Sequence, residues 1–100
     1  MIKHIVLIKI KGASSEDEKM NDLKKLKEAL DALPSQIPEI KSYDTGFNIS
    51  DASTASDFAL IGEFESKETL ETYKTHPEHQ KVLDLISSIK GRTAVVDFEF

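Results

Sequence analysis

Cysteine and tryptophan are both absent from this sequence of 100 residues. Without cysteine the protein can form no disulfide, no thiolate metal site and no cysteine nucleophile. No apolar run approaches the roughly 18 residues that a membrane-spanning helix needs, so no membrane partner is predicted. The segment 1–9 alternates apolar residues with lysine and has no small-residue cleavage site, so it does not resemble a signal peptide. We therefore expect a cytoplasmic protein.

An excess of positive charge is lacking as well. The chain has 13 lysine and arginine residues against 18 aspartate and glutamate residues, which gives a net charge of −5. Surfaces that bind nucleic acid are basic, because they neutralise phosphates, so no nucleic-acid partner is predicted. Apolar residues make up 39% and charged residues 31% of the chain, as in folded globular proteins. Its length is that of one domain, covering 1–100.

The hydrophobic pattern predicts four strands, in which apolar residues alternate along the chain. They span residues 2–11, 39–48, 57–65 and 93–100. The segment 39–48 is the most polar of the four. In the first strand, one set of alternate residues is expected to face the protein interior, and it consists of Ile2, His4, Val6, Ile8 and Ile10.

The segments that connect these strands have apolar residues at helical spacing. The helical segments extend from Ser15 to Pro34, from Ser66 to Tyr73 and from His76-Pro77 to Gly91. Ser15 and Glu18 have the spacing of a capping box, and proline is favoured at the first helical position. The order β-α-β-β-α-β is that of the ferredoxin-like fold, an α+β fold whose antiparallel sheet carries helices on one face.

The two faces of this sheet differ in polarity. The apolar face is expected to pack against the helices and contains Val6, Ile8, Phe58, Leu60, Phe64, Val96 and Phe98. The other face is half apolar and contains Ile5, Leu7, Ala59, Ile61 and Val95, together with Asp97 and Glu99. Such a face is too apolar to remain in water. We therefore predict a homodimer in which two sheets pack through this face, as in a dimeric α/β barrel.

Four segments, taken together and in order, resemble the stress-responsive A/B barrel domain family, abbreviated Dabb. They are Ile2-Lys-His-Ile-Val-Leu-Ile-Lys9, Phe58-Ala-Leu-Ile-Gly-Glu-Phe-Glu-Ser66, Tyr73-Lys-Thr-His-Pro-Glu-His79 and Val95-Val-Asp-Phe98. The resemblance covers essentially all 100 residues. It implies a dimer in which two sheets enclose a barrel. Most members of the family have no assigned activity.

A characterised plant cyclase of this family closes a linear polyketide by aldol chemistry. It uses a tyrosine and a histidine of a similar Tyr-x-x-His-Pro-x-His segment, which correspond to Tyr73 and His79 here. The resemblance therefore implies that these two residues are catalytic, and it implies a pocket histidine at His4. The cyclase has a further histidine where this chain has Phe58. Phe58 is thus expected to line the substrate site without hydrogen-bonding a carbonyl.

The residues themselves are consistent with a proton-transfer site. His79 lies near the start of the last helix, on the side that Val82 and Ile86 share, and should point towards the sheet. The positive end of the helix dipole disfavours a protonated imidazole, so a neutral base near pH 7 is expected. The Tyr73 hydroxyl could orient a substrate oxygen, with His4 on the same inner face.

Structural roles are open for each of these residues. Tyr73 and His79 could instead tether backbone at helix ends, and His4 could be a buried, hydrogen-bonded strand residue. His76 precedes a proline and is expected to cap the helix or to lie at the surface. His76 and His79 are three residues apart, but no third ligand is placed beside them, so no metal site is predicted. No glycine-rich phosphate loop is present, and no cofactor is predicted.

Three functions are consistent with these features. The first is a cyclase- or isomerase-type enzyme that acts on a small, partly apolar carbonyl compound through Tyr73 and His79. The second is a non-catalytic dimer that responds to stress or binds a small apolar ligand. The third is a cofactor-free monooxygenase, which only the fold supports. The sequence identifies no particular substrate.

Overall fold

The computed structural model describes all 100 residues, which form four strands, three α-helices and one short 3₁₀ helix. The strands are β1 (Ile2–Ile10), β2 (Ser42–Phe47), β3 (Phe58–Phe64) and β4 (Gly91–Glu99). The helices are α1 (Glu16–Asp31), η1 (Leu33–Ser35), α2 (Lys67–Thr75) and α3 (Pro77–Ser88). The predicted order of strands and helices is confirmed. The chain is an α+β protein with the ferredoxin-like fold.

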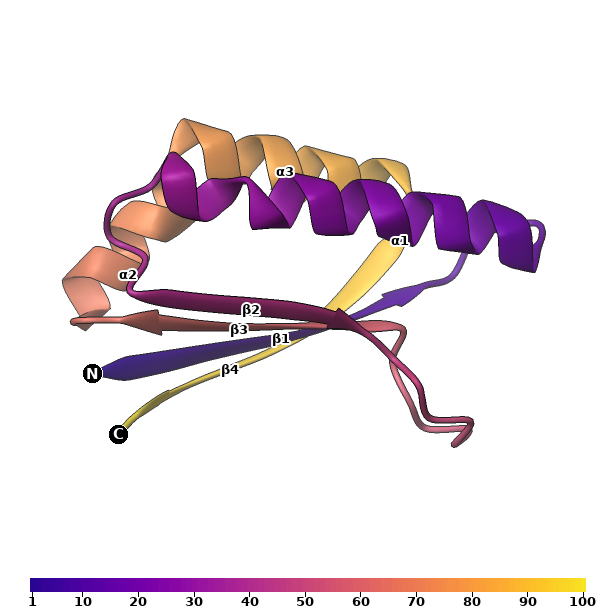
Figure 1. Ribbon diagram of the computed structural model, residues 1–100, viewed down its shortest axis with the longest axis horizontal. Helices are drawn as coiled ribbons and strands as arrows, with labels where there is room; N and C mark the ends of the chain where they lie inside the picture. The colour runs from indigo at the N-terminus through magenta and orange to yellow at the C-terminus, as the bar shows by residue number, and fades with distance from the viewer.

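The four strands form one antiparallel sheet in the order β2-β3-β1-β4. Figure 1 shows α1 and α3 on one face of this sheet and no helix on the other. Both chain ends lie at the same end of the sheet, where the amide of Phe100 donates to the carbonyl oxygen of Met1 at 3.1 Å (Figure 1). None of the helices combines the length and the apolar character that crossing a membrane requires.

Polar side chains mark the starts of the helices, where backbone amides have no partner within the helix. The Ser15 hydroxyl accepts from the amide of Glu18 at 3.1 Å. The Glu18 carboxylate binds Ser14 instead of completing the capping box. At the start of α3, Nδ1 of His76 accepts from the amide of Glu78 at 3.1 Å. His76 is therefore a helix cap, one of the two roles that the sequence predicts for it.

In the turn from α3 into β4, the residue in the left-handed region is Lys90, with φ of 55°. Gly91 meets a different requirement, because a Cβ atom there would lie 2.9 Å from Cγ2 of Ile86. The glycine thus allows the first residue of β4 to approach the end of α3 closely.

The core lies between the sheet and the helices, and β1 is at its centre. The alternation predicted for β1 is confirmed, because its five inward residues are all buried. The helices contribute mainly Leu23, Leu26, Leu30, Val82 and Ile86. Apart from the Tyr73 hydroxyl, the imidazole of His4 is the one polar side-chain group among the buried residues, and His4 is 5% exposed. A buried imidazole needs hydrogen-bond partners, so polar groups are expected beside His4.

β4 presents the opposite faces to those predicted. Asp97 is paired with His4, which faces the helices, and directly paired residues project to the same side of the sheet. Asp97 and Val95 therefore face the helices. Val96 and Phe98 face the other side, where they are 53% and 43% exposed. The prediction that Val95, Asp97 and Glu99 lie on the helix-free face is wrong. The prediction that Val96 and Phe98 contact the helices is wrong as well.

The error on β4 has a physical cause. Both sets of alternate residues on this strand contain valine, and the set with Val96 and Phe98 is the more apolar of the two. The most apolar face of a strand is usually assigned to the core. β4 is an edge strand that the helices leave largely uncovered, and all of its residues except Gly91 are exposed. Burial in the core therefore does not decide which face of β4 points inward.

The buried face of α1 gives a test of this core. Leu26→Ala should lower the free energy of unfolding by about 2–5 kcal/mol, because Leu26 is completely buried and the truncation leaves a cavity. Met20→Ala is the matched control on the same helix. Met20 is 42% exposed, so its truncation should cost about 0.5 kcal/mol or less. Urea denaturation measures both values, and equal losses would contradict the assigned core.

Candidate functional site

One cavity combines an apolar wall with several polar side chains. It lies between the helix-facing side of the sheet and the helices, and its volume is about 260 Å³. Nine of its 13 lining residues are hydrophobic. The lining consists of His4, Val6, Ile8, Leu30, Leu60, Tyr73, Lys74, His79, Val82, Leu83, Ile86, Thr93 and Val95. This volume is that of about nine water molecules at about 30 Å³ each, so the cavity suits a compound smaller than a typical drug.

Three of the four predicted site residues meet in this cavity. The rings of Tyr73 and His79 lie 4.4 Å apart between centroids, and those of Tyr73 and His4 lie 5.8 Å apart. They come from the end of α2, the first turn of α3 and the middle of β1. The short connection at His76 brings α2 and α3 together, so residues six positions apart in the chain share one wall of the cavity.

His79 is held in a defined tautomer. Its Nδ1 lies 2.9 Å from the carbonyl oxygen of Lys74. A carbonyl can only accept, so Nδ1 carries the proton and Nε2 keeps its lone pair. Burial lowers the pKa of His79, and the hydrogen bond to Lys74 opposes this shift only in part. His79 is therefore a neutral imidazole whose Nε2 can accept a proton.

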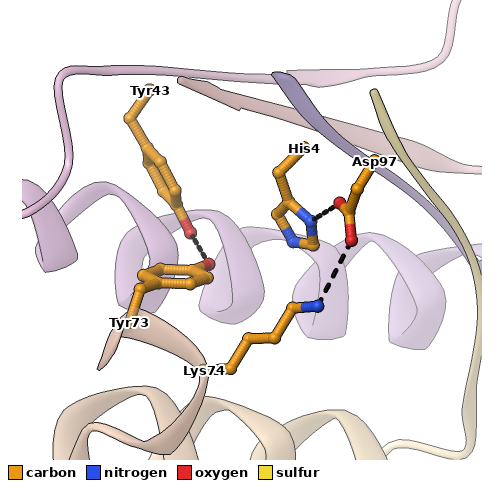
Figure 2. A network of polar contacts seen from close by, with 5 residues as sticks. All are labelled: His4, Tyr43, Tyr73, Lys74 and Asp97. Atoms are coloured by element: carbon orange, nitrogen blue, oxygen red, sulfur yellow. Dashed lines mark hydrogen bonds and ion pairs between the residues drawn. The ribbon is translucent and has the colours of Figure 1, made fainter. Parts of the chain in front are cut away.

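His4 is hydrogen-bonded to Asp97 across the β1–β4 pair. Its Nδ1 donates to Oδ1 of Asp97 at 2.5 Å, and Nζ of Lys74 lies 3.2 Å from Oδ2 (Figure 2). The side chains of His4, Asp97 and Lys74 are 6%, 29% and 38% exposed, so the network leads from the core to the surface. Burial alone would raise the pKa of Asp97, but the hydrogen bond from His4 and the ion pair with Lys74 lower it overall. The ionised Asp97 fixes the orientation of the His4 ring.

Tyr73 is hydrogen-bonded to a second tyrosine. The Oη atoms of Tyr43 and Tyr73 are 2.6 Å apart, with Tyr43 on β2 and Tyr73 on α2 (Figure 2). Burial raises the pKa of Tyr73 to about 12, and it also raises that of Tyr43. Both hydroxyls therefore stay protonated at neutral pH. Gly62 leaves room for the Tyr43 ring, because a Cβ atom there would lie 3.3 Å from Cδ1 of Tyr43.

Phe58, the fourth predicted site residue, does not line this cavity. It is 2% exposed and lies in the core, where its ring packs edge-on against Phe47 at 5.7 Å. Phe58 is paired with Ile8 near the end of β1, which separates it from the tyrosines along the strand. His76 also lies outside the lining, as the cap of α3. No three histidine, aspartate or glutamate side chains are grouped so that they could hold a metal ion.

Sequence reasoning missed three members of the site, which are Tyr43, Lys74 and Asp97. A signal for Asp97 did exist, because a histidine on the buried face of a central strand needs a partner, and the closing strand offers an acidic residue. Lys74 follows Tyr73 directly, but its partner lies 23 residues away in the chain. Tyr43 lies on the most polar strand, and no periodicity distinguishes it from its neighbours.

The assembled groups have complementary chemistry. His79 supplies a neutral base, and Tyr73 supplies a hydroxyl that stays protonated. His4 adds an imidazole that a carboxylate orients. A base and a hydrogen-bond donor in an apolar space can move a proton and stabilise the negative oxygen that results. These groups meet within a space that admits a small organic molecule.

Comparison with known proteins finds relatives that span the whole chain. The chain is 32% identical to an uncharacterized protein of Streptomyces coelicolor, and the 100 aligned residues span the full length of both proteins. A dimeric protein of unknown function and ferredoxin-like fold from Bacteroides fragilis is 34% identical, with a TM-score of 0.89 over 99% of this chain and 95% of that one. Hydroxynitrile lyase from Passiflora edulis has a TM-score of 0.79 over 97% and 90% of the two chains. Its identity is 16%, so this likeness concerns the fold alone.

The family model that matches describes the Stress responsive A/B Barrel Domain, Dabb, and it covers residues 2–100. This range contains all four segments on which the sequence resemblance was based. It also contains every residue that lines the cavity. The resemblance predicted from the sequence is therefore confirmed, and the chain belongs to the stress-responsive A/B barrel domain family.

Proposed function

We propose that this protein is an enzyme that moves a proton beside the carbonyl group of a small, mostly apolar compound, as a cyclase or isomerase does. The observation that carries the proposal is the position of His79. Its ring lines the apolar cavity next to Tyr73, and its Nε2 is unprotonated. Burial lowers its pKa and so keeps this base available at neutral pH. A positioned base of this kind is the main requirement of general base catalysis.

In the proposed step, Nε2 of His79 takes a proton from the carbon next to the substrate carbonyl. The electron pair of the broken C–H bond forms the C=C bond of an enolate, and the carbonyl oxygen becomes negative. The hydroxyl of Tyr73 donates a hydrogen bond to that oxygen. Where a second C=C bond is conjugated with the enolate, return of the proton from His79 to the far carbon gives an isomer. Attack of the enolate carbon on a second carbonyl of the same molecule breaks the C=O π bond and closes a ring, and the alkoxide that forms takes the proton from His79.

The charges around the cavity favour a substrate that is neutral before it reacts. Lys74 is the one lining residue with a fixed charge, and its ammonium group is already paired with Asp97 at 3.2 Å. His79 is a neutral imidazole, and Tyr73 and Thr93 contribute hydroxyl groups. A carboxylate or phosphate, which needs a cation, would therefore have to compete with Asp97 for Lys74. The apolar walls and the volume of about 260 Å³ favour a compact carbonyl compound.

Binding without catalysis is the competing function. Each polar group of the site already has a structural partner, because Nδ1 of His79 is bonded to the Lys74 carbonyl and the Tyr73 hydroxyl to Tyr43. The same cavity would then hold a small apolar ligand, with these side chains serving the fold. The hydroxynitrile lyase of the same fold is an enzyme, but its low identity gives this chain no activity by itself.

Deuterium exchange at carbon tests proton transfer without knowledge of the natural substrate. Wild-type protein in D₂O should speed the incorporation of deuterium next to the carbonyl of small ketones such as cyclohexanone and acetophenone. His79→Gln should slow this exchange by about 100-fold or more, because it removes the general base. Proton NMR follows the loss of the signal from the exchanging position.

His76→Gln is the matched control for this exchange experiment, because it removes a histidine that lies outside the cavity. It should leave the exchange rate unchanged. The melting temperature of His79→Gln should stay close to that of the wild type. If wild type and His79→Gln exchange the ketones at equal rates, or if no ketone exchanges, binding without catalysis becomes the better description.

The same position of His79 predicts a pH dependence. His79 should titrate below 6.5, because burial disfavours its charged form. Its pKa is then higher in the unfolded than in the folded state, so stability should fall as the pH drops from about 6.5 through the folded-state pKa. NMR of the three histidine rings measures the pKa, and His79→Gln should remove this part of the acid sensitivity. A His79 pKa above 6.5 would contradict the assigned environment.

We also propose that two copies of the chain associate through the helix-free face of the sheet. The apolar residues of this face are Ile5, Leu7, Ala59, Ile61, Val96 and Phe98. Leu7, Val96 and Phe98 are each more than 40% exposed, which is a large apolar area for an isolated domain. The Bacteroides fragilis protein, which is 34% identical, is dimeric. A second copy related by twofold symmetry would cover the same residues on both chains.

Two adjacent valines test this dimer. Val96 and Val95 are 53% and 55% exposed, but they lie on opposite faces of β4. Val96→Glu should convert the dimer to monomer by burying a charge in the interface, whereas Val95→Glu should leave it intact. Sedimentation equilibrium at micromolar concentrations measures both. A monomeric wild type would refute the dimer, and dissociation by Val95→Glu alone would place the interface on the wrong face.

A further inference from the structure

We propose that Tyr43 and Tyr73 form a chain of two hydroxyl donors that recognises a negatively charged ligand oxygen. In this chain Tyr43 donates to Tyr73, and Tyr73 directs its own proton into the cavity. Tyr43 is then a positioning residue, because it acts through Tyr73. The ligand class is a small apolar compound with one oxygen that bears negative charge, such as an enolate or a phenolate. This inference rests on the proposed function, since the enolate is the species that proton transfer would form.

Counting protons gives the direction of the chain. The two hydroxyls have two protons and share one hydrogen bond, at 2.6 Å, and neither has another partner in the protein. One proton is therefore left over. Tyr73 lines the cavity and Tyr43 does not. If Tyr43 donates, the remaining proton belongs to Tyr73 and can meet a ligand. In the reverse arrangement a negative ligand oxygen in the cavity would receive no proton from Tyr73, so the ligand favours donation by Tyr43.

Packing holds both rings in place. The Tyr73 ring contacts Phe64 at 4.8 Å and His79 at 4.4 Å between centroids, and Tyr73 has no exposed surface. The Tyr43 ring lies over Gly62, where even a Cβ atom would come within 3.3 Å of it. Donors that are fixed before the reaction need no reorganisation when charge appears on the ligand. In such a chain each hydrogen bond polarises the next, so Tyr43 makes Tyr73 the stronger donor.

The composition of the protein makes the chain measurable. Tyr43 and Tyr73 are the two tyrosines of the sequence, and tryptophan is absent. Biosynthetic replacement of tyrosine by 3-fluorotyrosine, whose phenol is more acidic, brings the titration to a lower pH. Fluorine NMR should then show two signals, and Tyr43→Phe should remove one of them.

In Tyr43→Phe the fluorotyrosine at position 73 should titrate at higher pH than in the wild type, because the donor that stabilises its phenolate is gone. If the Tyr43 side chain served packing alone, Tyr43→Phe would keep its ring in place and leave the pKa of the fluorotyrosine at position 73 unchanged. A lower or unchanged pKa at Tyr73 therefore overturns the donor chain. This measurement needs no ligand, so it stands even if the exchange of ketones fails.

Binding of 4-nitrophenol tests the ligand class. This compound has a single ring and one ionisable oxygen, and its visible absorbance reports the phenolate. The wild type should bind it as the phenolate, and Tyr43→Phe should weaken that binding about 10-fold through the weaker donor at Tyr73. Tyr73→Phe should weaken it at least as much. Nitrobenzene has the same ring without the hydroxyl, and its affinity should change by less than about 2-fold.

Two results of the binding experiment would overturn the inference. Equal losses for 4-nitrophenol and nitrobenzene in Tyr43→Phe would mean that Tyr43 only shapes the cavity. No binding of 4-nitrophenol by the wild type would refute the ligand class. If both tyrosine experiments give the expected results but the protein does not exchange ketones, the donor chain stands and the proposed proton transfer is refuted.

Discussion

His4 is the one buried histidine of the core, and in the register between β1 and β4 it lies directly opposite Asp97. A buried imidazole without a partner is costly, so this pairing favours one register over its neighbours. Because side chains alternate along a strand, a shift of one residue would turn Asp97 away from the helices. Val95 and Thr93 would leave the cavity wall in the same shift. The bond between His4 and Asp97 thus links the fold of the sheet to the shape of the site.

Burial acts on Tyr43, Tyr73 and His79 in one direction, towards their neutral forms. It raises the pKa of both tyrosines and lowers that of His79. Asp97 departs from this rule, because His4 and Lys74 both stabilise its charge. The result is a neutral donor and a neutral base in an apolar space, with one ion pair at its border. Such a space keeps the base unprotonated and the donor protonated, as the proposed proton transfer requires.

Much of this arrangement could be predicted from the sequence, because local patterns carry it. The alternation of β1 identified its buried face, and His76-Pro77 identified the start of α3, so His4, Tyr73 and His79 could be placed near one another. The faces of β4 could not be predicted, because exposed apolar residues on an edge strand alternate in the sequence in the same way as core residues. Nothing local predicts that the Tyr43 hydroxyl meets Tyr73, since β2 is polar throughout and the contact depends on how α2 lies on the sheet.

The exposure of β4 on both sides has a thermodynamic consequence. One face of the strand carries Thr93 and Val95, which line the cavity, and the other carries Val96 and Phe98, which a second chain would cover. This strand is thus common to the two binding equilibria. If a ligand in the cavity changes the affinity between the two chains, association changes the affinity for that ligand by the same factor. Ligand affinity and dimer affinity are therefore quantities that should be measured together.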